Sequence, residues 1–545
     1  MQALRALALA LLLLVMLELL VRSVGTAPHP DFLDLAAQAH QATDGPQDDG
    51  FRPGPRPGTF EQAVDFGRQR LLWKSTPPGI RIAVFGSSAV YDGWHPYFGC
   101  FPYWLQRNLR AIAGQKTPIE VINSGVPGAN LTMHARRLED FLRLNRPNLV
   151  IVYSGNNEFH PIRARKAWWR GYNPRAERLG IALSSLHLYR LLRCALQPVI
   201  PPPELLDHPH DVSVDAIPAF PDEQDRLLAT AIYREGLERI VTVTRRAGVG
   251  LLLTTVANNL LQVPPPSEGP AAEALRALER DLRQTPPDQA SARIAQTRAR
   301  MSTRADVAAL GLTLHRAGRR EEGFRFLLEA ETMALRPHQG NEALREAARR
   351  VAARRGIPLC DVARELAARS PDGIPGFDLF RDECHFRSEG HRLMGEILAR
   401  AIVDQELLPL PGSLEEHKQR LQAALHSFRV EGDPWRLDQW AYDRLETTQA
   451  RRRLGTTPAL RQTLWGHHCM EPDHPHPEAH HHPDIAAKSY RQALHASGPP
   501  GPLFLNLGLS LWMSGRTEEA REALDRAAGY LPEDPEIWNH RASLP

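Results

Sequence analysis

Apolar and polar positions follow two alternating patterns through the middle of the chain. Short apolar runs rich in β-branched and aromatic residues are separated by longer stretches whose apolar residues recur at helical spacing. The runs predict strands, at 81–85, 119–123, 148–153, 250–256 and 356–361. The longer stretches predict helices, at 102–113, 131–144, 223–246, 341–355 and 389–403. Near-continuous apolar strands that alternate with helices indicate a parallel sheet covered on both faces.

Shorter features flank this alternating region. Residues 60–73 predict a short helix before the first strand. Ser388 is expected to cap the last helix, because a serine hydroxyl can accept a bond from a free N–H of the first turn. The segment 159–203 is basic and aromatic. It either forms a lid over a binding site of this domain or lies on the surface as helix and loop.

Two segments outside the alternating region resemble each other. One lies in an insertion at about 264–340, and the other lies near the C-terminus. Superposing them aligns Leu310/Leu507, Gly311/Gly508, Leu312/Leu509, Leu314/Leu511, Gly318/Gly515, Arg319/Arg516, Glu321/Glu518, Glu322/Glu519, Leu327/Leu524 and Ala330/Ala527. Each pattern predicts a helix, a glycine turn and a second helix, and each resembles the tetratricopeptide repeat. Residues 485–496 are typical of the second helix of a preceding repeat. Because isolated repeats rarely stand alone, we expect the two to pack together or each to lean on the domain formed by the alternating strands and helices.

The N-terminus predicts attachment to a membrane. Arg5 precedes an apolar run at 6–21, which Glu18 interrupts and Arg22 closes. The run is shorter than the ~20 residues that a comfortable membrane span needs. It favours an uncleaved signal anchor with the rest of the chain outside the cytoplasm, periplasmic or on the cell surface. A cleaved signal peptide, which would make the protein secreted, and an amphipathic or buried helix are the alternatives.

Length and composition narrow the class of protein. With 545 residues, the chain should contain two or three domains. The net charge is +3 and no strong basic tract stands out, so nucleic acid is not an expected partner. The 5 cysteines are widely spaced without a C-x-x-C pair, which implies neither a disulfide framework nor a thiolate zinc site. The histidine-rich stretch at 465–484 favours a solvated linker over a metal site.

These patterns divide the chain into parts. Residues 1–25 form the anchor or signal peptide, and residues 26–75 form a linker with the short helix. The domain formed by the alternating strands and helices covers 76–408, including the helical insertion. The remaining part, 409–545, is helical and holds the second repeat-like segment at about 485–540, where a protein partner is an expected ligand.

Candidate chemistry lies after the predicted strands. Gly86-Ser87-Ser88 follows the first strand, and an N-x-G-x-x-G turn that contains Gly128 follows the second. Ser154-Gly-Asn-Asn-Glu158, which contains Asn157, follows the third strand. Asp382-Glu-Cys-His385 comes after the last strand and a short helix. Because carboxyl ends of parallel strands meet at one sheet edge, all four segments can converge on one crevice.

These residue types suit nucleophilic catalysis. A serine hydroxyl such as that of Ser88 needs a base, and His385 can take its proton. Asp382 can fix the imidazole tautomer and stabilise the imidazolium. A tetrahedral intermediate also needs donors for its oxyanion, which the N–H groups of Gly128 and Ser88 and the Asn157 amide can supply.

The four segments together resemble the SGNH (GDSL-type) hydrolase superfamily. In this resemblance Ser88 takes the nucleophile position, Gly128 and Asn157 take the oxyanion positions, and Asp382 and His385 match the Asp-x-x-His block. The resemblance covers roughly 78–160 and 340–405. It implies a flavodoxin-like α/β/α fold, hydrolysis of esters of glycans, lipids or other acylated substrates, and no metal or organic cofactor. Ser87 and Glu158 both stand where the family carries Asp, which suggests a divergent subgroup with its catalytic positions filled.

Alternatives remain for single residues and for the whole chain. His391 lies inside the final predicted helix and is expected to be structural. Glu383 and Cys384 are expected to point away from Asp382 and His385. Some members of the superfamily transfer the acyl group to a sugar, so an O-acyltransferase acting on an extracytoplasmic glycan is the nearest alternative. A non-catalytic repeat scaffold with a degenerate hydrolase domain is the rival from another class.

Overall fold

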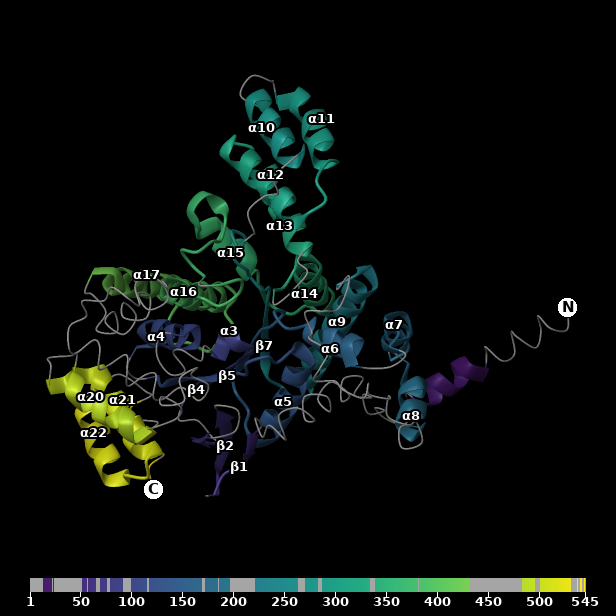
Figure 1. Cartoon of the computed structure of the whole chain (residues 1–545). Coiled ribbons are helices and arrows are strands. Elements are labelled where there is room, and N and C mark those ends of the chain that lie inside the picture. The colour runs from purple at the N-terminus through teal and green to yellow at the C-terminus, as the bar shows by residue number, and fades with distance from the viewer. Residues whose placement is uncertain are drawn as a thin grey trace.

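A five-stranded parallel sheet lies at the centre of the molecule (Figure 1). The computed structural model describes residues 13–23, 51–196, 221–430 and 483–544, with short gaps inside these ranges. The strands are β4 (Ile80–Gly86), β5 (Ile119–Gly125), β6 (Leu149–Tyr153), β7 (Gly250–Thr254) and β8 (Leu359–Cys360). Their spatial order, β5-β4-β6-β7-β8, is the flavodoxin-like order of a doubly wound sheet. The predicted strands are therefore confirmed.

Helices form one layer on each face of this sheet. The first face carries α4 (Phe101–Ala113) and α16 (Ser388–Asp404), and the second carries α5 (Leu131–Leu144), α9 (Glu223–Ala247) and α14 (Glu342–Arg355). Ile82 and Val84 of β4 belong to the core of the first face. Ala83 and Phe85 belong to the core of the second. All residues of β4 are buried because both faces are covered, which confirms the α/β/α class.

The short helix predicted at 60–73 is wrong. The chain instead forms a small antiparallel sheet of β1 (Phe51–Pro53), β2 (Thr59–Val64) and β3 (Gln69–Lys74). The Phe60 ring is fully buried and packs edge-on against Phe141 of α5, with ring centroids 5.7 Å apart. This contact is remote in sequence, so the periodicity of the segment alone did not reveal it.

The predicted cap of the last helix is shifted by one residue. Arg387 occupies the N-cap position in extended backbone without a side-chain capping bond, and Ser388 is the first helical residue. The reason is the preceding loop. The Arg387 N–H donates to the Leu379 carbonyl at 2.8 Å, so the extended segment continues through Arg387.

The basic, aromatic segment after β6 forms helices on the outside of the second layer. They are α6 (His160–Trp168), α7 (Pro174–Leu183) and α8 (His187–Leu196). α7 packs against α9, as expected for surface helices. The helix that contains residues 13–21 meets α8 through Glu18, whose carboxylate accepts bonds from the N–H groups of His187 and Leu188 at 2.9 and 2.8 Å. Within the described residues, no helix combines the length and apolar composition needed to cross a membrane.

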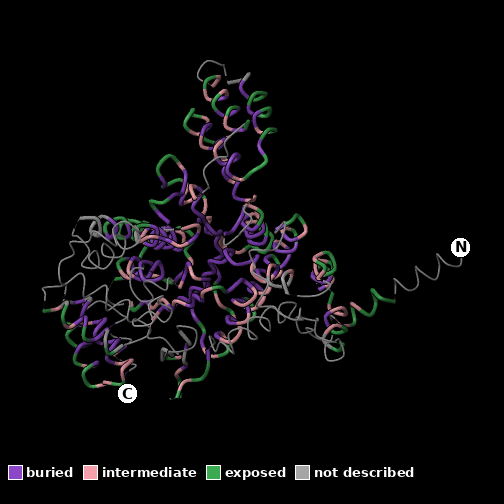
Figure 2. The backbone as a smooth tube through the Cα atoms, in the orientation of Figure 1, coloured by how far each residue is buried: buried purple, intermediate pink, exposed green. Residues whose placement is uncertain are grey.

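Both repeat-like segments form helical hairpins, and they lie apart (Figure 1). The insertion contains α10 (Pro270–Leu282), α11 (Pro287–Arg298), α12 (Arg304–Arg316) and α13 (Arg320–Thr332). The C-terminal group contains α20 (Pro483–His495), α21 (Pro500–Met513) and α22 (Thr517–Tyr530). Each group therefore leans on the α/β domain instead of on the other. Both groups contain buried residues, which are purple in Figure 2. The histidine-rich residues 467–482 lie outside the described residues.

Candidate active site

Ser88 lies directly beyond the carboxyl end of β4. It begins a short helix, α3 (Ser88–Tyr91), and the preceding Ser87 is fully buried. The chain turns at Gly86, where a Cβ would lie only 2.1 Å from the Tyr153 carbonyl oxygen of the neighbouring strand. Glycine therefore permits the close approach of the two strands at the point where Ser88 is presented.

Asp382 and His385 lie on a tight loop just before α16. An antiparallel bridge between Phe380 and Phe386 closes the loop. Inside it, Asp382 Oδ1 accepts bonds from the N–H groups of Cys384 at 3.0 Å and His385 at 2.8 Å. The aspartate thus stabilises the turn that carries it, in the manner of an Asx turn.

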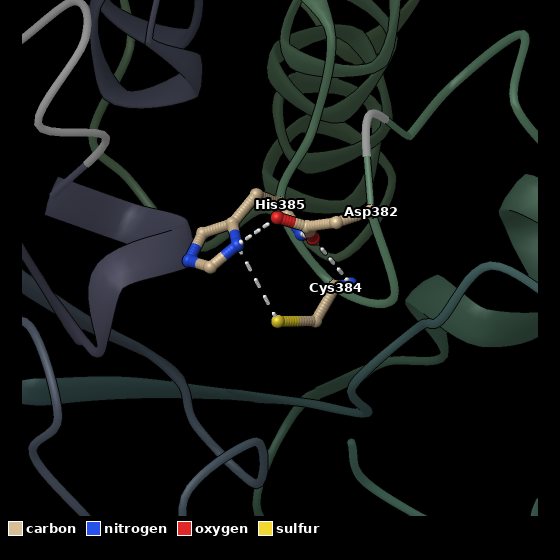
Figure 3. A group of neighbouring side chains, drawn as sticks. All are labelled: Asp382, Cys384 and His385. Atoms are coloured by element: carbon tan, nitrogen blue, oxygen red, sulfur yellow. Dashed lines mark hydrogen bonds and ion pairs between the residues drawn. The ribbon is translucent and has the colours of Figure 1, made fainter. Parts of the chain in front are cut away.

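The structure brings Ser88, His385 and Asp382 into one hydrogen-bonded chain. His385 Nε2 lies 2.7 Å from Ser88 Oγ. On the other side of the ring, His385 Nδ1 lies 2.7 Å from Asp382 Oδ2 (Figure 3). With a proton on Nδ1 donated to the carboxylate, Nε2 is an acceptor facing the serine hydroxyl. The three residues predicted as nucleophile, base and carboxylate are therefore in contact.

Burial and neighbouring charge act in opposite directions on this pair. Burial disfavours the imidazolium, but the hydrogen bond and charge of Asp382, together with Cys384, raise the pKa of His385 above its ordinary value. Burial also opposes ionisation of Asp382, but bonds from the His385 ring and from two backbone N–H groups hold the pKa of this carboxyl below its usual value. Both directions favour the charged pair, so the imidazolium that forms when His385 takes a proton is stabilised beside the carboxylate.

The two predicted oxyanion residues lie on the loops after β5 and β6. Gly128 has a φ of 72°, in the left-handed region that favours glycine. Asn157 Nδ2 donates to the Ala129 carbonyl at 3.1 Å, which joins the two loops. An amide carries two N–H groups, so this bond leaves the second one for another acceptor. Gly86 pairs with both Gly125 and Tyr153, so the loops begin at the same sheet edge as Ser88.

Glu158 has a role that its sequence position did not reveal. Its side chain is buried, and Oε1 accepts bonds from the Leu131 N–H at 3.0 Å and from Ser154 Oγ at 3.3 Å. Burial raises the pKa of this carboxyl to about 7. Glu158 therefore binds the first N–H of α5, next to the N-cap residue Asn130, and holds the loops after β5 and β6 together. Its partner Leu131 is remote in sequence, so local spacing carried no signal for this contact.

The remaining expectations near the dyad have different outcomes. Glu383 accepts a bond from Gln262 Nε2 at 3.0 Å. His391 is buried and its Nδ1 accepts from the Phe101 N–H at 3.2 Å, so its structural role is confirmed. The expectation for Cys384 is wrong, because its Sγ lies 3.8 Å from His385 Nδ1 (Figure 3). The turn stabilised by Asp382 folds the thiol back beside the imidazole.

Comparison with known proteins adds little to this geometry. No protein-family model matches the chain, and neither does any curated protein. Similar solved structures include a lipase/acylhydrolase from Enterococcus faecalis, with 14% identity, 61% of this chain and 100% of that chain covered, and a TM-score of 0.29. A GDSL-like lipase from Bacteroides thetaiotaomicron has 11% identity and a TM-score of 0.27, and the match covers 60% of this chain and 88% of that chain. The acetylxylan esterase Axe2 from Geobacillus stearothermophilus has 13% identity and a TM-score of 0.29, and the match covers 60% of this chain and 96% of that chain.

These TM-scores are low, so the fold follows from the chain's own sheet order and the chemistry from its own side chains. None of the structures named above is described as a tetratricopeptide protein. The likeness of the two hairpins to that repeat therefore stays a prediction from sequence.

Proposed function

We propose that the chain is a serine hydrolase that cleaves ester bonds of an acylated substrate, either a glycan or a lipid. The observation that carries the proposal is the chain of two 2.7 Å contacts from Ser88 Oγ through His385 to Asp382. It lies at the sheet edge that also carries Gly128 and Asn157. A serine, a base, an orienting carboxylate and oxyanion donors are the set that acyl transfer requires.

In this proposal Ser88 Oγ attacks the acyl carbonyl carbon. His385 Nε2 takes the hydroxyl proton, and Asp382 stabilises the imidazolium. The carbonyl oxygen of the tetrahedral intermediate accepts bonds from the N–H groups of Ser88 and Gly128 and from the Asn157 amide. His385 then returns the proton to the leaving alcohol as the C–O bond breaks, which leaves an acyl group on Ser88.

The second half of the reaction repeats these steps with water. His385 takes a proton from water, the resulting hydroxide attacks the acyl carbon, and Ser88 leaves with the proton. A sugar hydroxyl in place of water would make the protein an O-acyltransferase with the same residues. Supplying a glycan acceptor to the acylated protein separates the two, because transfer yields an acylated glycan and hydrolysis yields a free acid.

A fluorophosphonate probe tests the nucleophile directly. Wild-type protein should be labelled covalently, and Ser88→Ala should not be. Ser87→Ala is the matched control, because Ser87 is adjacent but fully buried, and it should still be labelled. Labelling that persists in Ser88→Ala, or folded wild type that is not labelled, would contradict the proposal.

Ester hydrolysis should depend equally on the orienting carboxylate. Asp382→Asn should lower kcat by roughly 10³–10⁴-fold, because the amide favours the wrong imidazole tautomer. Its melting temperature should change little in comparison. A variant that fails to fold would instead indicate that Asp382 mainly stabilises the loop, because its side chain accepts hydrogen bonds from two backbone N–H groups there.

We also propose that the N-terminal segment attaches the protein to a membrane, with the α/β domain outside the cytoplasm. Side chains at 13–17 and 19–20 are exposed and apolar. The helix that holds them meets α8, which exposes Leu191, Leu192 and Leu196. Large exposed apolar surfaces are typical of sites that meet a membrane or a protein. Full-length protein should co-sediment with lipid vesicles, and protein lacking residues 1–25 should lose most of this binding.

A further inference from the structure

Three potential metal ligands converge on the loop before α16. Ligand atoms of Asp382, Cys384 and His385 all lie within 4.8 Å of one another (Figure 3). His385 Nδ1 is 2.7 Å from Asp382 Oδ2 and 3.8 Å from Cys384 Sγ. The proposed reaction uses the carboxylate and the imidazole but assigns no step to the thiol.

We propose that this loop binds a zinc-class divalent cation, which switches the catalytic histidine off. Thiolate sulfur, imidazole nitrogen and carboxylate oxygen are the ligands that zinc prefers. Tetrahedral zinc with ordinary bond lengths places such ligand atoms roughly 3.4–3.6 Å apart. The separations of 2.7 and 3.8 Å lie on either side of these values, so Asp382 Oδ2 would have to move away from Nδ1 and toward Sγ to accommodate the ion.

The loop is already built for this geometry. Asp382 Oδ1 is occupied by two backbone N–H groups, which leaves Oδ2 facing the imidazole. The Phe380–Phe386 bridge holds both ends of the loop. Cys384 is 2% exposed, whereas the side chains of His385 and Asp382 are 26% and 38% exposed. An ion would therefore enter from the side of the exposed ligands, with water as its fourth ligand.

Inhibition follows from the position of one proton, and this consequence rests on the proposed function. In the state that activates Ser88, the neutral imidazole carries its proton on Nδ1, and Nε2 accepts from Ser88 Oγ. A cation on Nδ1 requires that proton to be on Nε2, while the Cys384 thiol releases its proton to solvent. The Nε2–H group then donates to Ser88 Oγ and cannot take its proton, so the serine is no longer activated.

Cys384 is the residue that makes the site selective. Carboxylate and imidazole pairs are common, and a thiolate adds affinity for zinc-class ions over magnesium or calcium. The wide spacing of the cysteines had argued against a zinc site made of several thiolates. Only one thiolate is needed here, because the turn brings it beside the histidine.

The experiment combines a spectroscopic and a kinetic readout on the full-length protein. Co²⁺ bound to a thiolate has a charge-transfer absorption band that Co²⁺ bound to imidazole and carboxylate lacks. Wild type should show this band, and Cys384→Ser should lose it. Cys469→Ser is the matched control, because Cys469 lies beside the histidines at 467–482 and would be the thiol of any site formed there.

Hydrolysis of a small ester is then measured with Zn²⁺, with each variant normalised to its own metal-free rate. Wild type and Cys469→Ser should be inhibited alike and recover with EDTA. Loss of even an outer partner costs roughly 10–100-fold in metal affinity, so Cys384→Ser should need at least about tenfold more Zn²⁺. Cys384→Ala provides a second variant, and circular dichroism shows that each is folded.

Each outcome decides a separate point. Equal inhibition of wild type and Cys384→Ser, or a cobalt band that depends on Cys469 instead of Cys384, would overturn the metal site. A cobalt band at Cys384 in a protein without hydrolytic activity would support the metal site and contradict the proposed function. Ester hydrolysis by a protein that shows no such cobalt band would support the proposed function and contradict the metal site.

Discussion

The hairpins α12–α13 and α21–α22 share a local sequence pattern, with identical residues at the ten aligned positions given above, and form the same local structure. In each, a glycine in the left-handed region makes the turn, with φ of 83° at Gly318 and 74° at Gly515. In each, the next arginine pairs with a glutamate three residues later, Glu322 in the first and Glu519 in the second. Helix spacing and turn chemistry therefore determine a hairpin wherever the pattern occurs.

The two hairpins differ in what holds them to the α/β domain. Glu331 of α13 forms a buried ion pair with Arg345 of α14, at 2.8 Å. Arg345 also donates to the Val256 carbonyl at 2.8 Å. The C-terminal hairpin instead shares an apolar cluster with α4, through Cys100, Tyr103 and Trp104.

This difference determines which hairpin reaches the candidate active site. Val256 follows β7 and packs on Gly155, where a Cβ would lie 2.8 Å from its Cγ1. Gly155 lies in the loop that carries Asn157. The first hairpin is thus joined through Arg345 and Val256 to an oxyanion loop, whereas the second is joined to α4. Changes in the first should alter both stability and catalysis, and changes in the second should alter stability alone.

The largest effect is expected from breaking the buried ion pair. Arg345→Ala leaves Glu331 as an unpaired buried charge, which should lower the free energy of unfolding by about 3–5 kcal/mol. Urea denaturation measures this loss, and kcat for ester hydrolysis should fall with it. Arg350→Ala is the control, because Arg350 lies on the same helix and its side chain is 77% exposed. If Arg345→Ala loses no more unfolding free energy than Arg350→Ala, the ion pair does not hold the first hairpin to the α/β domain.

Equivalent core leucines of the two hairpins provide the direct comparison. Leu327→Ala and Leu524→Ala each open a cavity in a buried cluster. Each should lower the free energy of unfolding of its own hairpin by about 2–5 kcal/mol. Hydrogen exchange should locate the loss in the altered hairpin. Only Leu327→Ala should also lower kcat. If Leu524→Ala lowers it equally while the α/β domain stays folded, the C-terminal hairpin is coupled to the site as well.

Acid should weaken the C-terminal group through His540, whose ring lies 6.0 Å from that of Trp512 on α21. Burial lowers the pKa of His540 to about 4, whereas the unfolded chain keeps the ordinary value of 6.5. Since the unfolded state binds more protons between these values, stability is full above pH 6.5 and falls as pH approaches 4. The loss from pH 7 to pH 5 should be about 2 kcal/mol. Limited proteolysis at each pH tests this, with His540→Phe as a variant that should not respond. A wild-type cleavage rate that does not change with pH would contradict the account.

The smallest effects are expected at the two turn glycines. Gly318→Ala and Gly515→Ala each place a Cβ in left-handed backbone, which should cost about 1–2 kcal/mol. Neither turn has another atom within 4 Å of the added Cβ, so the cost should be conformational and similar in both. Thermal unfolding of the two variants checks this equality. Unequal losses would mean that the hairpins differ already at their turns.

Local pattern predicted the central fold and the order of its functional segments. The strands at β4 to β7 and the helices α4, α5, α9 and α14 were found within a few residues of their observed bounds, because each carries its own period of buried positions. The segments that carry Ser88, Gly128, Asn157, Asp382 and His385 could be placed at one sheet edge because each comes after a strand whose carboxyl end reaches that edge. The resemblance of the four segments to a known hydrolase pattern then indicated the individual residues.

Only tertiary structure decided the contacts between residues remote in sequence. Phe60 became part of a small sheet because its partner Phe141 lies on α5, and Glu158 binds the start of α5 because Leu131 lies opposite it. Cys384 came beside His385 because the aspartate of the same turn folds the backbone, which residue spacing cannot report. The sequence by itself therefore determined the local elements and the chemistry they carry. The packing decided which side chains meet, because burial and hydrogen bonding act on distance in space and not along the chain.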